Sequence, residues 1–217
     1  MPGRHSRDRF SIAEGDNIAM NIIFYTQRVE TDPVYGERRD CTDQRIAELL
    51  ALCGYIPMPV PNIREIAENM AKQVHPKGIV FTGGNSLAKY GGDAPERDET
   101  ERMLVSWGIA HEIPLFGICR GMQFLADCFG GKIASVEGHI ATRHEIRGEL
   151  LRDSVNSYHT LALWEVPKEL KVLGTATDGS IEAFCHRELS VMAVGWHPER
   201  EPAYAEEDVE LIRNFLG

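Results

Sequence analysis

The sequence predicts an α/β fold in which a largely parallel central sheet is flanked by helices and carries an antiparallel extension. Apolar runs typical of buried strands alternate with helix-like stretches between residues 22 and 129. Closely spaced strand-like runs joined by short polar turns follow between residues 171 and 196. No apolar run approaches the roughly 20 residues of a membrane-spanning helix. Strands separated by helices favour parallel pairing in a sheet that is covered on both faces.

The first elements alternate between strand and helix. Ile22–Tyr25 is rich in β-branched and aromatic residues and predicts a buried strand. Apolar residues recur at helical spacing from 46 to 53, and Gly54 is expected to end that helix. Asn62 and Glu65 predict the cap and first turn of a second helix, with apolar residues 63, 66, 70 and 74 on its face.

The later elements follow in the same way. Gly78–Thr82 and Leu115–Ile118 predict buried strands, with a helix around 103–110 between them. Towards the C-terminus we expect three strands that extend the sheet antiparallel and then a closing helix, at 171–176, 180–184, 191–196 and 209–216.

Length and charge limit the organisation and the partners. A chain of 217 residues suits one domain, expected at 20–217, and the polar segment 1–19 is expected to be a disordered extension. A net charge of −10 argues against nucleic-acid binding but allows a local pocket for a small anion. The five cysteines form no C-x-x-C pair, so we expect no disulfide framework and a reducing cytoplasmic location, without a membrane anchor.

The motif most indicative of chemistry is G-x-C-x-G at Gly117–Gly121. It follows an apolar strand and precedes a helix, like the cysteine counterpart of the G-x-S-x-G nucleophile elbow. Such a turn holds the nucleophile in a strained backbone conformation and sets Cys119 at a helix N-terminus, which favours the thiolate. The alternative is a tight turn around a buried structural thiol.

A thiolate that attacks an amide needs a base, a group that orients the base, and donors for the oxyanion. His197 and Glu199 end an apolar strand and are the candidates for base and orienting carboxylate. The backbone N–H groups of Gly84 and Arg120 are candidates for the oxyanion hole. The alternatives are a turn histidine beside a proline, with His159 as a rival base, and an ordinary Gly-Gly turn.

Metal binding has no support in the sequence. The histidines from residue 139 onward show no H-x-x-x-H spacing; they are His139, His144, His159, His186 and His197. We therefore expect no metal and no cofactor.

Four motifs together resemble a known family: TGGN at 82–85, GICRGMQ at 117–123, VNSYH at 155–159 and GWHPE at 195–199. They are similar to the flavodoxin-like class I glutamine amidotransferases, and most to their stand-alone γ-glutamyl hydrolase branch, peptidase family C26. The resemblance implies a Cys119-His197-Glu199 triad and a glutamyl-thioester intermediate. It also implies that the glutamyl group is bound by Gln123, Asn156, Ser157 and Tyr158.

Further segments resemble a narrower group, the γ-glutamyl-CDP-amidate hydrolases of capsule phosphoramidate biosynthesis. These are YTQR at 25–28, ERRD at 37–40, SIEAF at 180–184 and WHPERE at 196–201. The VNSYHTLAL segment departs from the VNSxHHQ form of larger hydrolases, which leaves open what His159 and Thr160 do.

Arginines near the predicted site suggest a phosphorylated substrate. Arg28 follows the first strand and is expected at the same sheet edge as Cys119, with Arg38 and Arg39 in a short loop beyond it. Their planar donors suit the phosphate oxygens of a nucleotide-linked leaving group. Surface ion pairs with Glu37 and Asp40 are an equally open interpretation.

The leading hypothesis is therefore hydrolysis of a γ-glutamyl amide in a small-molecule substrate. The alternatives are a γ-glutamyl-γ-aminobutyrate hydrolase, a glutaminase subunit that supplies ammonia to a separate synthase, and a degenerate binding module. The sequence leaves the oligomeric state open.

Overall fold

The computed structural model describes residues 21–217, and the predicted extension at 1–19 lies outside that range. The main sheet has 11 strands, and its principal path runs in the spatial order β4 (Ile56–Pro59), β1 (Ile22–Tyr25), β5 (Gly78–Phe81), β6 (Leu115–Ile118), β13 (Val191–Val194), β12 (Ile181–His186), β11 (Leu170–Thr175), β8 (Ile140–Gly148) and β9 (Arg152–Tyr158). Off this path, β10 (Leu161–Glu165) pairs with β12 and with β7 (Lys132–Ser135).

The predicted fold class is confirmed. Strands β4, β1, β5, β6 and β13 pair in parallel, and every pairing from β12 onward is antiparallel. One strand differs from the expectation: β13 does not belong to the antiparallel extension. It follows β12 through a tight turn and inserts between β12 and β6, so it runs antiparallel to the first and parallel to the second.

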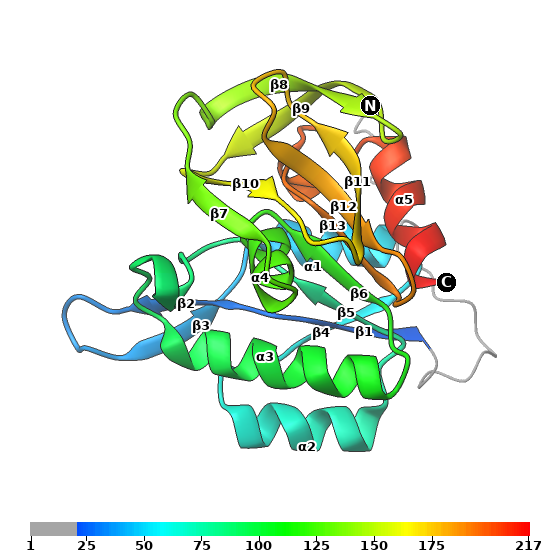
Figure 1. Ribbon diagram of the computed structural model, residues 1–217. Helices are drawn as coiled ribbons and strands as arrows, with labels where there is room; N and C mark the ends of the chain where they lie inside the picture. The colour runs from blue at the N-terminus through cyan, green and yellow to red at the C-terminus, as the bar shows by residue number, and fades with distance from the viewer. Residues whose placement is uncertain (1–20) are drawn as a thin grey trace, which may run out of the picture.

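Helices cover both faces of the parallel strands (Figure 1). On one face lie α2 (Arg64–Val74), α3 (Pro95–Ala110) and α4 (Arg120–Cys128), with Phe24 of β1 in their core cluster. On the other face lie α1 (Gln44–Leu52) and α5 (Glu206–Leu216), which pack on Ile23. Adjacent residues of β1 point to opposite faces, so a short apolar strand supplies both cores.

Helix α2 differs from its predicted capping and packing. Ile63 occupies the cap position, and its apolar side chain makes no cap bond. The predicted cap, Asn62, donates instead to Gln27 O at 3.0 Å and to Asp40 Oδ1 at 2.7 Å. The buried face is formed by Ala67 and Ala71 rather than by the larger apolar residues. Small side chains let α2 approach α3 closely, as the two helices do in Figure 1.

Residues 28–41 form a hairpin, not the expected loop. Strands β2 (Arg28–Thr31) and β3 (Arg38–Cys41) pair antiparallel as a sheet of their own. The hairpin projects from the body of the molecule beside α3 (Figure 1). Arg38 and Arg39 therefore lie on a strand.

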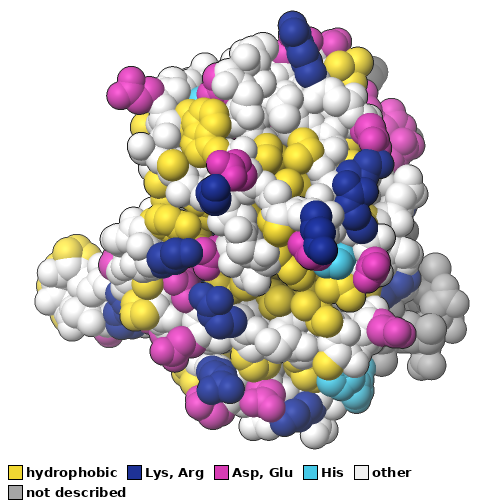
Figure 2. Space-filling view, viewed as in Figure 1, with side chains coloured by type: hydrophobic (Ala, Val, Ile, Leu, Met, Phe, Trp, Pro, Cys, Tyr) yellow, Lys and Arg dark blue, Asp and Glu magenta, His cyan; other side chains and the backbone are white. Residues whose placement is uncertain are grey.

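The lengths of the helices and the distribution of surface charge limit which partners the protein can bind. Among residues 21–217, the longest helices are too short or too polar to cross a membrane. On the face drawn in Figure 2, Lys and Arg side chains are interspersed with Asp and Glu. Such a mixed surface offers no extended basic stripe on that face for a polyanion.

Candidate active site

Cys119 sits on a strained turn between β6 and α4. Its backbone has φ +52° and ψ −106°, in the region that residues with a side chain rarely adopt. A Cβ at Gly117 would lie 2.8 Å from the Gly121 carbonyl oxygen, and one at Gly121 would lie 2.0 Å from Phe81 O. The turn therefore requires both glycines, and it sets Cys119 at the N-terminus of α4 as the motif predicts.

His197 and Glu199 follow β13, at the same edge of the sheet as Cys119. His197 Nδ1 and Glu199 Oε1 are 2.6 Å apart, and both side chains are buried. Burial lowers the pKa of His197, but the Cys119 sulfur, as hydrogen-bond partner and charge, and the Glu199 carboxylate outweigh it and raise this pKa to about 10. At neutral pH the imidazole is therefore protonated between two acceptors.

The loop after β5 completes the surroundings of these residues. A Cβ at Gly83 would lie 2.8 Å from His197 Cε1 and 3.8 Å from Cys119 Cβ, so this position needs glycine. Gly84 has φ +86° and packs against the Arg28 side chain. The Gly83 carbonyl accepts from Arg97 Nη1 at 3.0 Å. Because C=O and N–H point in opposite directions in a trans peptide, the Gly84 N–H faces away from Arg97.

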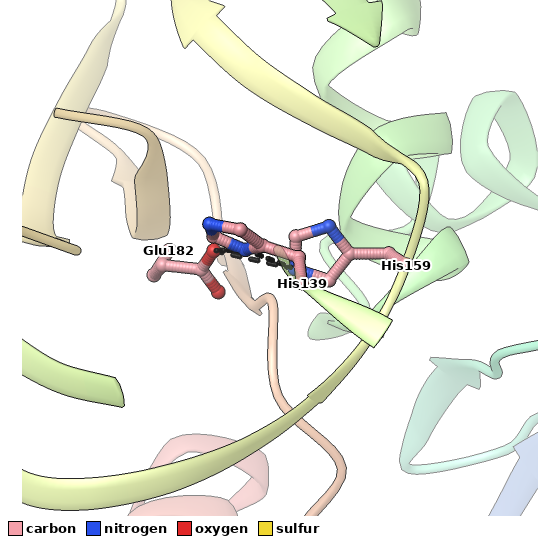
Figure 3. Close-up of side chains that lie close together, drawn as sticks. All are labelled: His139, His159 and Glu182. Atoms are coloured by element: carbon pink, nitrogen blue, oxygen red, sulfur yellow. Dashed lines mark hydrogen bonds and ion pairs between the residues drawn. The ribbon is translucent and has the colours of Figure 1, made fainter. Parts of the chain in front are cut away.

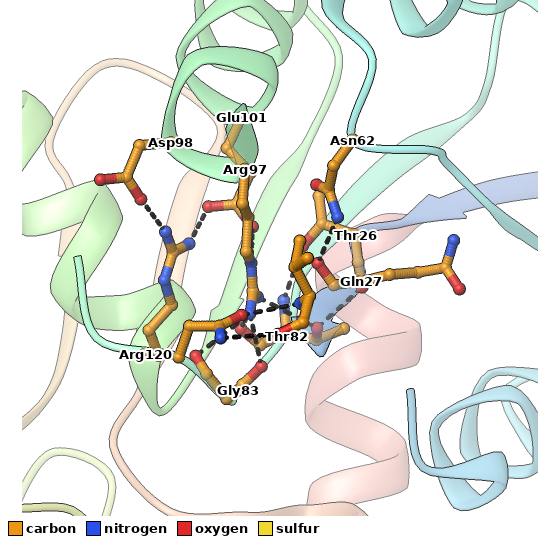
Figure 4. Close-up of polar contacts among 12 residues, drawn as sticks. Thr26, Gln27, Asn62, Thr82, Gly83, Arg97, Asp98, Glu101 and Arg120 are labelled. Atoms are coloured by element: carbon orange, nitrogen blue, oxygen red, sulfur yellow. Dashed lines mark hydrogen bonds and ion pairs between the residues drawn. The ribbon is translucent and has the colours of Figure 1, made fainter. Parts of the chain in front are cut away.

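Arg97 belongs to a buried charge network beneath this loop (Figure 4). Its guanidinium donates to Thr82 O, Gly83 O and Gly84 O at 2.7–3.1 Å and to Glu101 Oε1 at 2.9 Å. Burial lowers the Arg97 pKa to about 9, so the group stays cationic at neutral pH. The Arg120 side chain pairs with Glu101 and with Asp98. These ion pairs hold Arg120 in place at the first turn of α4. The network thus fixes the two backbone segments expected to form an oxyanion hole.

A cleft of about 290 Å³ opens beside Cys119. Its lining includes Gly84, Cys119, Arg120, Gln123 and Tyr158, all of which the sequence analysis singled out. Gln123 Nε2 donates to Leu161 O at 2.8 Å, which fixes its amide at the cleft wall. The Tyr158 ring meets the His197 ring edge-on, with centroids 5.7 Å apart.

Two other predicted glutamyl contacts point elsewhere. Asn156 is buried and bonds to the backbone of His197 and to Glu201 Oε1, and it does not line the cleft. Ser157 Oγ donates to His139 O at 2.8 Å. Both side chains are used to hold neighbouring protein segments.

The three predicted arginines separate into two groups. Arg28 lines a small cavity of about 30 Å³ together with Gly83, His197 and Glu199. Arg38 is paired with Glu96, and Arg39 is paired with Asp32 at 2.8 Å and Glu37 at 2.7 Å. Arg28 also pairs with Glu30 at 2.7 Å. The structure thus brings Arg28 to the site, whereas Arg38 pairs with a residue of α3 and Arg39 pairs within the hairpin.

Sequence reasoning missed Arg97 and Arg200. Pro95 at the first turn of α3 and the four-residue spacing of Arg97 and Glu101 were signals that a helix begins earlier than residue 103 and pairs these charges. Arg200 lies in the small cavity with Arg28, and its guanidinium stacks on Tyr158 at 4.7 Å. Its place next to His197 and Glu199 in sequence was the available signal.

Comparisons with known proteins relate the chain to a family. Residues 39–217 match the family model for class-I glutamine amidotransferases. A γ-glutamyl-CDP-amidate hydrolase from Campylobacter jejuni subsp. jejuni serotype O:2 is 32% identical over 201 residues, covering 90% of this chain and 98% of that protein. A glutamine-hydrolysing GMP synthase subunit from Pyrococcus abyssi is 32% identical over 180 residues, covering 79% of this chain and 89% of that protein.

A solved structure shares the fold. The crystal structure of a glutamine amidotransferase from Thermotoga maritima matches with a TM-score of 0.65 at 15% identity, covering 91% of this chain and 84% of that one. The family model spans most of the chain, from the β2–β3 hairpin to the C-terminal helix. The chain therefore belongs to the class I glutamine amidotransferase family.

Proposed function

We propose that the protein is a cysteine hydrolase that cleaves a γ-glutamyl amide bond and releases glutamate. The observation that carries the proposal is the strained backbone of Cys119, whose sulfur faces the buried His197–Glu199 pair. A nucleophile, a base and a group that orients the base are the parts that covalent hydrolysis requires.

In the first step, the Cys119 thiolate attacks the γ-carbonyl carbon. The proton that drives leaving-group departure is already on His197, because its pKa is raised to about 10. The C–N bond breaks, this proton moves to the departing nitrogen, and a glutamyl thioester remains on Cys119. Glu199 keeps the imidazole ring oriented through Nδ1.

In the second step, water replaces the leaving group. His197, now neutral, accepts a proton from water as the water oxygen attacks the thioester carbonyl. The C–S bond breaks, glutamate leaves, and the thiolate and imidazolium are restored. In both steps the N–H groups of Gly84 and Arg120 would stabilise the oxyanion, and the network of Arg97 would preorganise them.

The substrate we favour is γ-glutamyl-CDP-amidate. The relative of that name is matched over 98% of its length, so the similarity spans nearly all of that protein. Arg28 supports this choice, because it lines a cavity that also contains His197, where a phosphate group would replace its present partner Glu30. Arg200 lines the same cavity and adds a second cation for phosphate oxygens. We also propose a reducing cytoplasmic location, which would keep the Cys119 thiol free for this reaction.

A glutaminase that works as one part of a larger synthase is the second candidate. The similarity to the GMP synthase subunit from Pyrococcus abyssi favours it, since that protein is named as one subunit of a glutamine-hydrolysing synthase. In this role the chain would act on glutamine and deliver ammonia to a partner. A γ-glutamyl-γ-aminobutyrate hydrolase shares the same chemistry with a smaller leaving group.

The test is glutamate release by the purified chain alone. The substrates are γ-glutamyl-CDP-amidate, γ-glutamyl-γ-aminobutyrate and glutamine, each assayed over a range of concentrations. We expect the nucleotide-linked substrate to have a kcat/KM at least about tenfold above the other two, a difference of roughly 1.4 kcal/mol.

Cys119→Ala is the matched control, because it removes only the sulfur from a folded turn. We expect it to release no glutamate above the uncatalysed rate. Turnover by this variant at the wild-type rate would overturn the mechanism. A preference of the wild-type chain for glutamine would favour the glutaminase hypothesis instead.

A further inference from the structure

Two histidines and a glutamate converge on one interior point next to the cleft, with a third histidine, His144, beside them. His139 precedes β8, His144 lies within β8, His159 follows β9, and Glu182 lies in β12. His139, His159 and Glu182 are only 5%, 8% and 0% exposed. In Figure 3 the rings of His139 and His159 and the Glu182 carboxylate face one another. The fold brings together residues far apart in sequence, which explains why their spacing carries no metal signal.

The separations between these side chains are too long for charge-assisted hydrogen bonds. Glu182 Oε1 lies 3.3 Å from His159 Nε2, 3.6 Å from His139 Nδ1 and 3.7 Å from His144 Nε2. His139 Nδ1 and His159 Nε2 are 3.4 Å apart. Hydrogen bonds between charged nitrogen and oxygen atoms are about 2.7–2.9 Å long. Tetrahedral zinc with bonds of 2.0–2.1 Å sets its ligand atoms about 3.3–3.4 Å apart.

The carboxylate also lacks ordinary partners. Among residues 21–217, neither oxygen of Glu182 has a hydrogen-bond partner, and neither does His144 Nε2. A buried carboxylate without hydrogen bonds is costly unless a cation compensates it. A metal ion between His139, His159 and Glu182 would compensate the charge of this carboxylate.

An outer carboxylate fixes the orientation of one histidine. His139 Nε2 is 3.0 Å from Asp178 Oδ2, and Asp178 Oδ1 accepts from Ser180 N and Oγ at 3.0 and 2.7 Å. With the ring proton on Nε2, the lone pair of Nδ1 points into the cluster. Metal-binding histidines are held in this way by a carboxylate behind the ring.

We propose that His139, His159 and Glu182 bind one zinc ion through Nδ1, Nε2 and Oε1, which all lie within 4.8 Å of one another. Three protein ligands leave the fourth tetrahedral position to a water molecule. The proposal rests on the geometry of the cluster and is independent of the proposed function.

The zinc ion would join two parts of the sheet. Within residues 21–217, the β8–β9 hairpin pairs with the remaining strands only where β8 meets β11, at Gly148 and Arg147. That hairpin ends in Tyr158, which contacts His197, and His159 and Glu182 line a small cavity together with Cys119. A clamp between β8, β9 and β12 would therefore hold the surroundings of the candidate triad.

The experiment measures zinc bound to the full-length chain. The protein is stripped with chelator, loaded with zinc chloride, passed through a desalting column and analysed for metal content. We expect about one zinc per chain, and a tetrahedral cobalt spectrum when cobalt replaces zinc. Zinc at a hundredfold excess over its Kd should raise the Tm by roughly 5–10 °C.

Variants locate the ion. Glu182→Gln and His159→Ala should weaken zinc binding at least a hundredfold, and His111→Ala, an exposed histidine at the end of α3, should not change it. Asp178→Asn changes only the partly exposed outer carboxylate, so it keeps the test decisive if the core variants do not fold. We expect it to weaken zinc binding tenfold or more. Cys119→Ala should bind zinc as the wild type does.

Two results would overturn the proposal. One is a wild-type chain that retains less than about a tenth of an equivalent of zinc after desalting. The other is zinc that is lost in Cys119→Ala but kept in Asp178→Asn, since the ion would then lie at the candidate nucleophile.

Discussion

Asn156 holds the backbone of His197 on both sides. Its Nδ2 donates to the His197 carbonyl oxygen at 2.8 Å, and its Oδ1 accepts from the His197 N–H at 2.9 Å. The same Nδ2 donates to Glu201 Oε1 at 2.8 Å. A side chain of β9 thus fixes the position of the candidate base, although β9 and β13 are not neighbours in the sheet.

Asn156→Ala is therefore expected to lower kcat by about 10–100-fold, with KM within about twofold of the wild type. Losing the clamp loosens His197, whereas the glutamyl cleft does not include the Asn156 side chain. The control is Ser154→Ala, an exposed residue two positions earlier on the same strand. A rise in KM with unchanged kcat would contradict this role and restore the expected role in substrate binding.

Local patterns predicted the parallel half of the fold because each strand or helix there has its own apolar pattern and turn residues. Gly117 and Gly121 predict the turn around Cys119 because close backbone contact excludes every larger side chain. These patterns extend over only a few neighbouring residues, so they can be recognised in the sequence.

Long-range polar pairing could not be predicted in this way. Asn62 looks like a helix cap in sequence, and only the folded chain offers it Asp40 as a stronger partner. The role of Asn156 depends on its contact with a residue 41 positions away. Likewise, Arg38 and Arg39 could be read equally well as phosphate ligands or as surface ion pairs until the hairpin placed them beside Glu96 and Asp32.

The protonation of His197 predicts how stability depends on pH. Its pKa is raised to about 10 in the folded protein, above the ordinary value of 6.5. Folding therefore favours the protonated form, so the stabilisation is fully present below pH 6.5 and is lost as the pH rises through about 10. We expect the free energy of unfolding in urea to fall with pH across this window more steeply for the wild type than for His197→Gln. Parallel curves for the two proteins would contradict the raised pKa.

Replacing Glu199 by Gln should reduce kcat/KM by roughly 10–100-fold, less than the 10²–10⁴-fold expected for His197→Ala. The amide can still hydrogen-bond His197 Nδ1 but no longer stabilises the imidazolium by charge. The measurement is steady-state glutamate release by both variants. Equal losses in the two would mean that Glu199 does more than orient and stabilise the ring.

Alkylation should distinguish Cys119 from the other cysteines. Burial raises the pKa of Cys53 and of Cys128 to about 11, so these thiols stay protonated and unreactive at neutral pH. Burial also raises the pKa of Cys185. We expect iodoacetamide to label Cys119 first, as measured by peptide mapping over time. His197→Ala should slow that labelling and leave the slower labelling of Cys41 unchanged, and early labelling of another cysteine would contradict the assignment.

The buried charge network predicts a large effect on stability. Arg97→Met would leave the Glu101 carboxylate less compensated and free the carbonyls of Thr82, Gly83 and Gly84, so we expect a loss of about 3–5 kcal/mol in the free energy of unfolding. Arg102→Met, an exposed change on the same helix, is the control and should cost less than about 1 kcal/mol. Urea unfolding measures both. A similar small change in the two variants would show that other contacts hold the loop.

The positions of the arginines predict which of them selects the substrate. Arg28, which also pairs with Glu30, lines the cavity at His197 together with Arg200, whereas Arg38 pairs with Glu96 of α3. Arg28→Ala should therefore lower kcat/KM for γ-glutamyl-CDP-amidate by about 10–100-fold, because a charge-assisted contact contributes roughly 1.5–3 kcal/mol. Its kcat/KM for γ-glutamyl-γ-aminobutyrate should stay within about threefold of the wild-type value, since that leaving group carries no phosphate. Arg38→Ala is the matched control and should leave the preference unchanged. If Arg38→Ala lost the preference and Arg28→Ala kept it, the hairpin rather than the cavity would bind the phosphates.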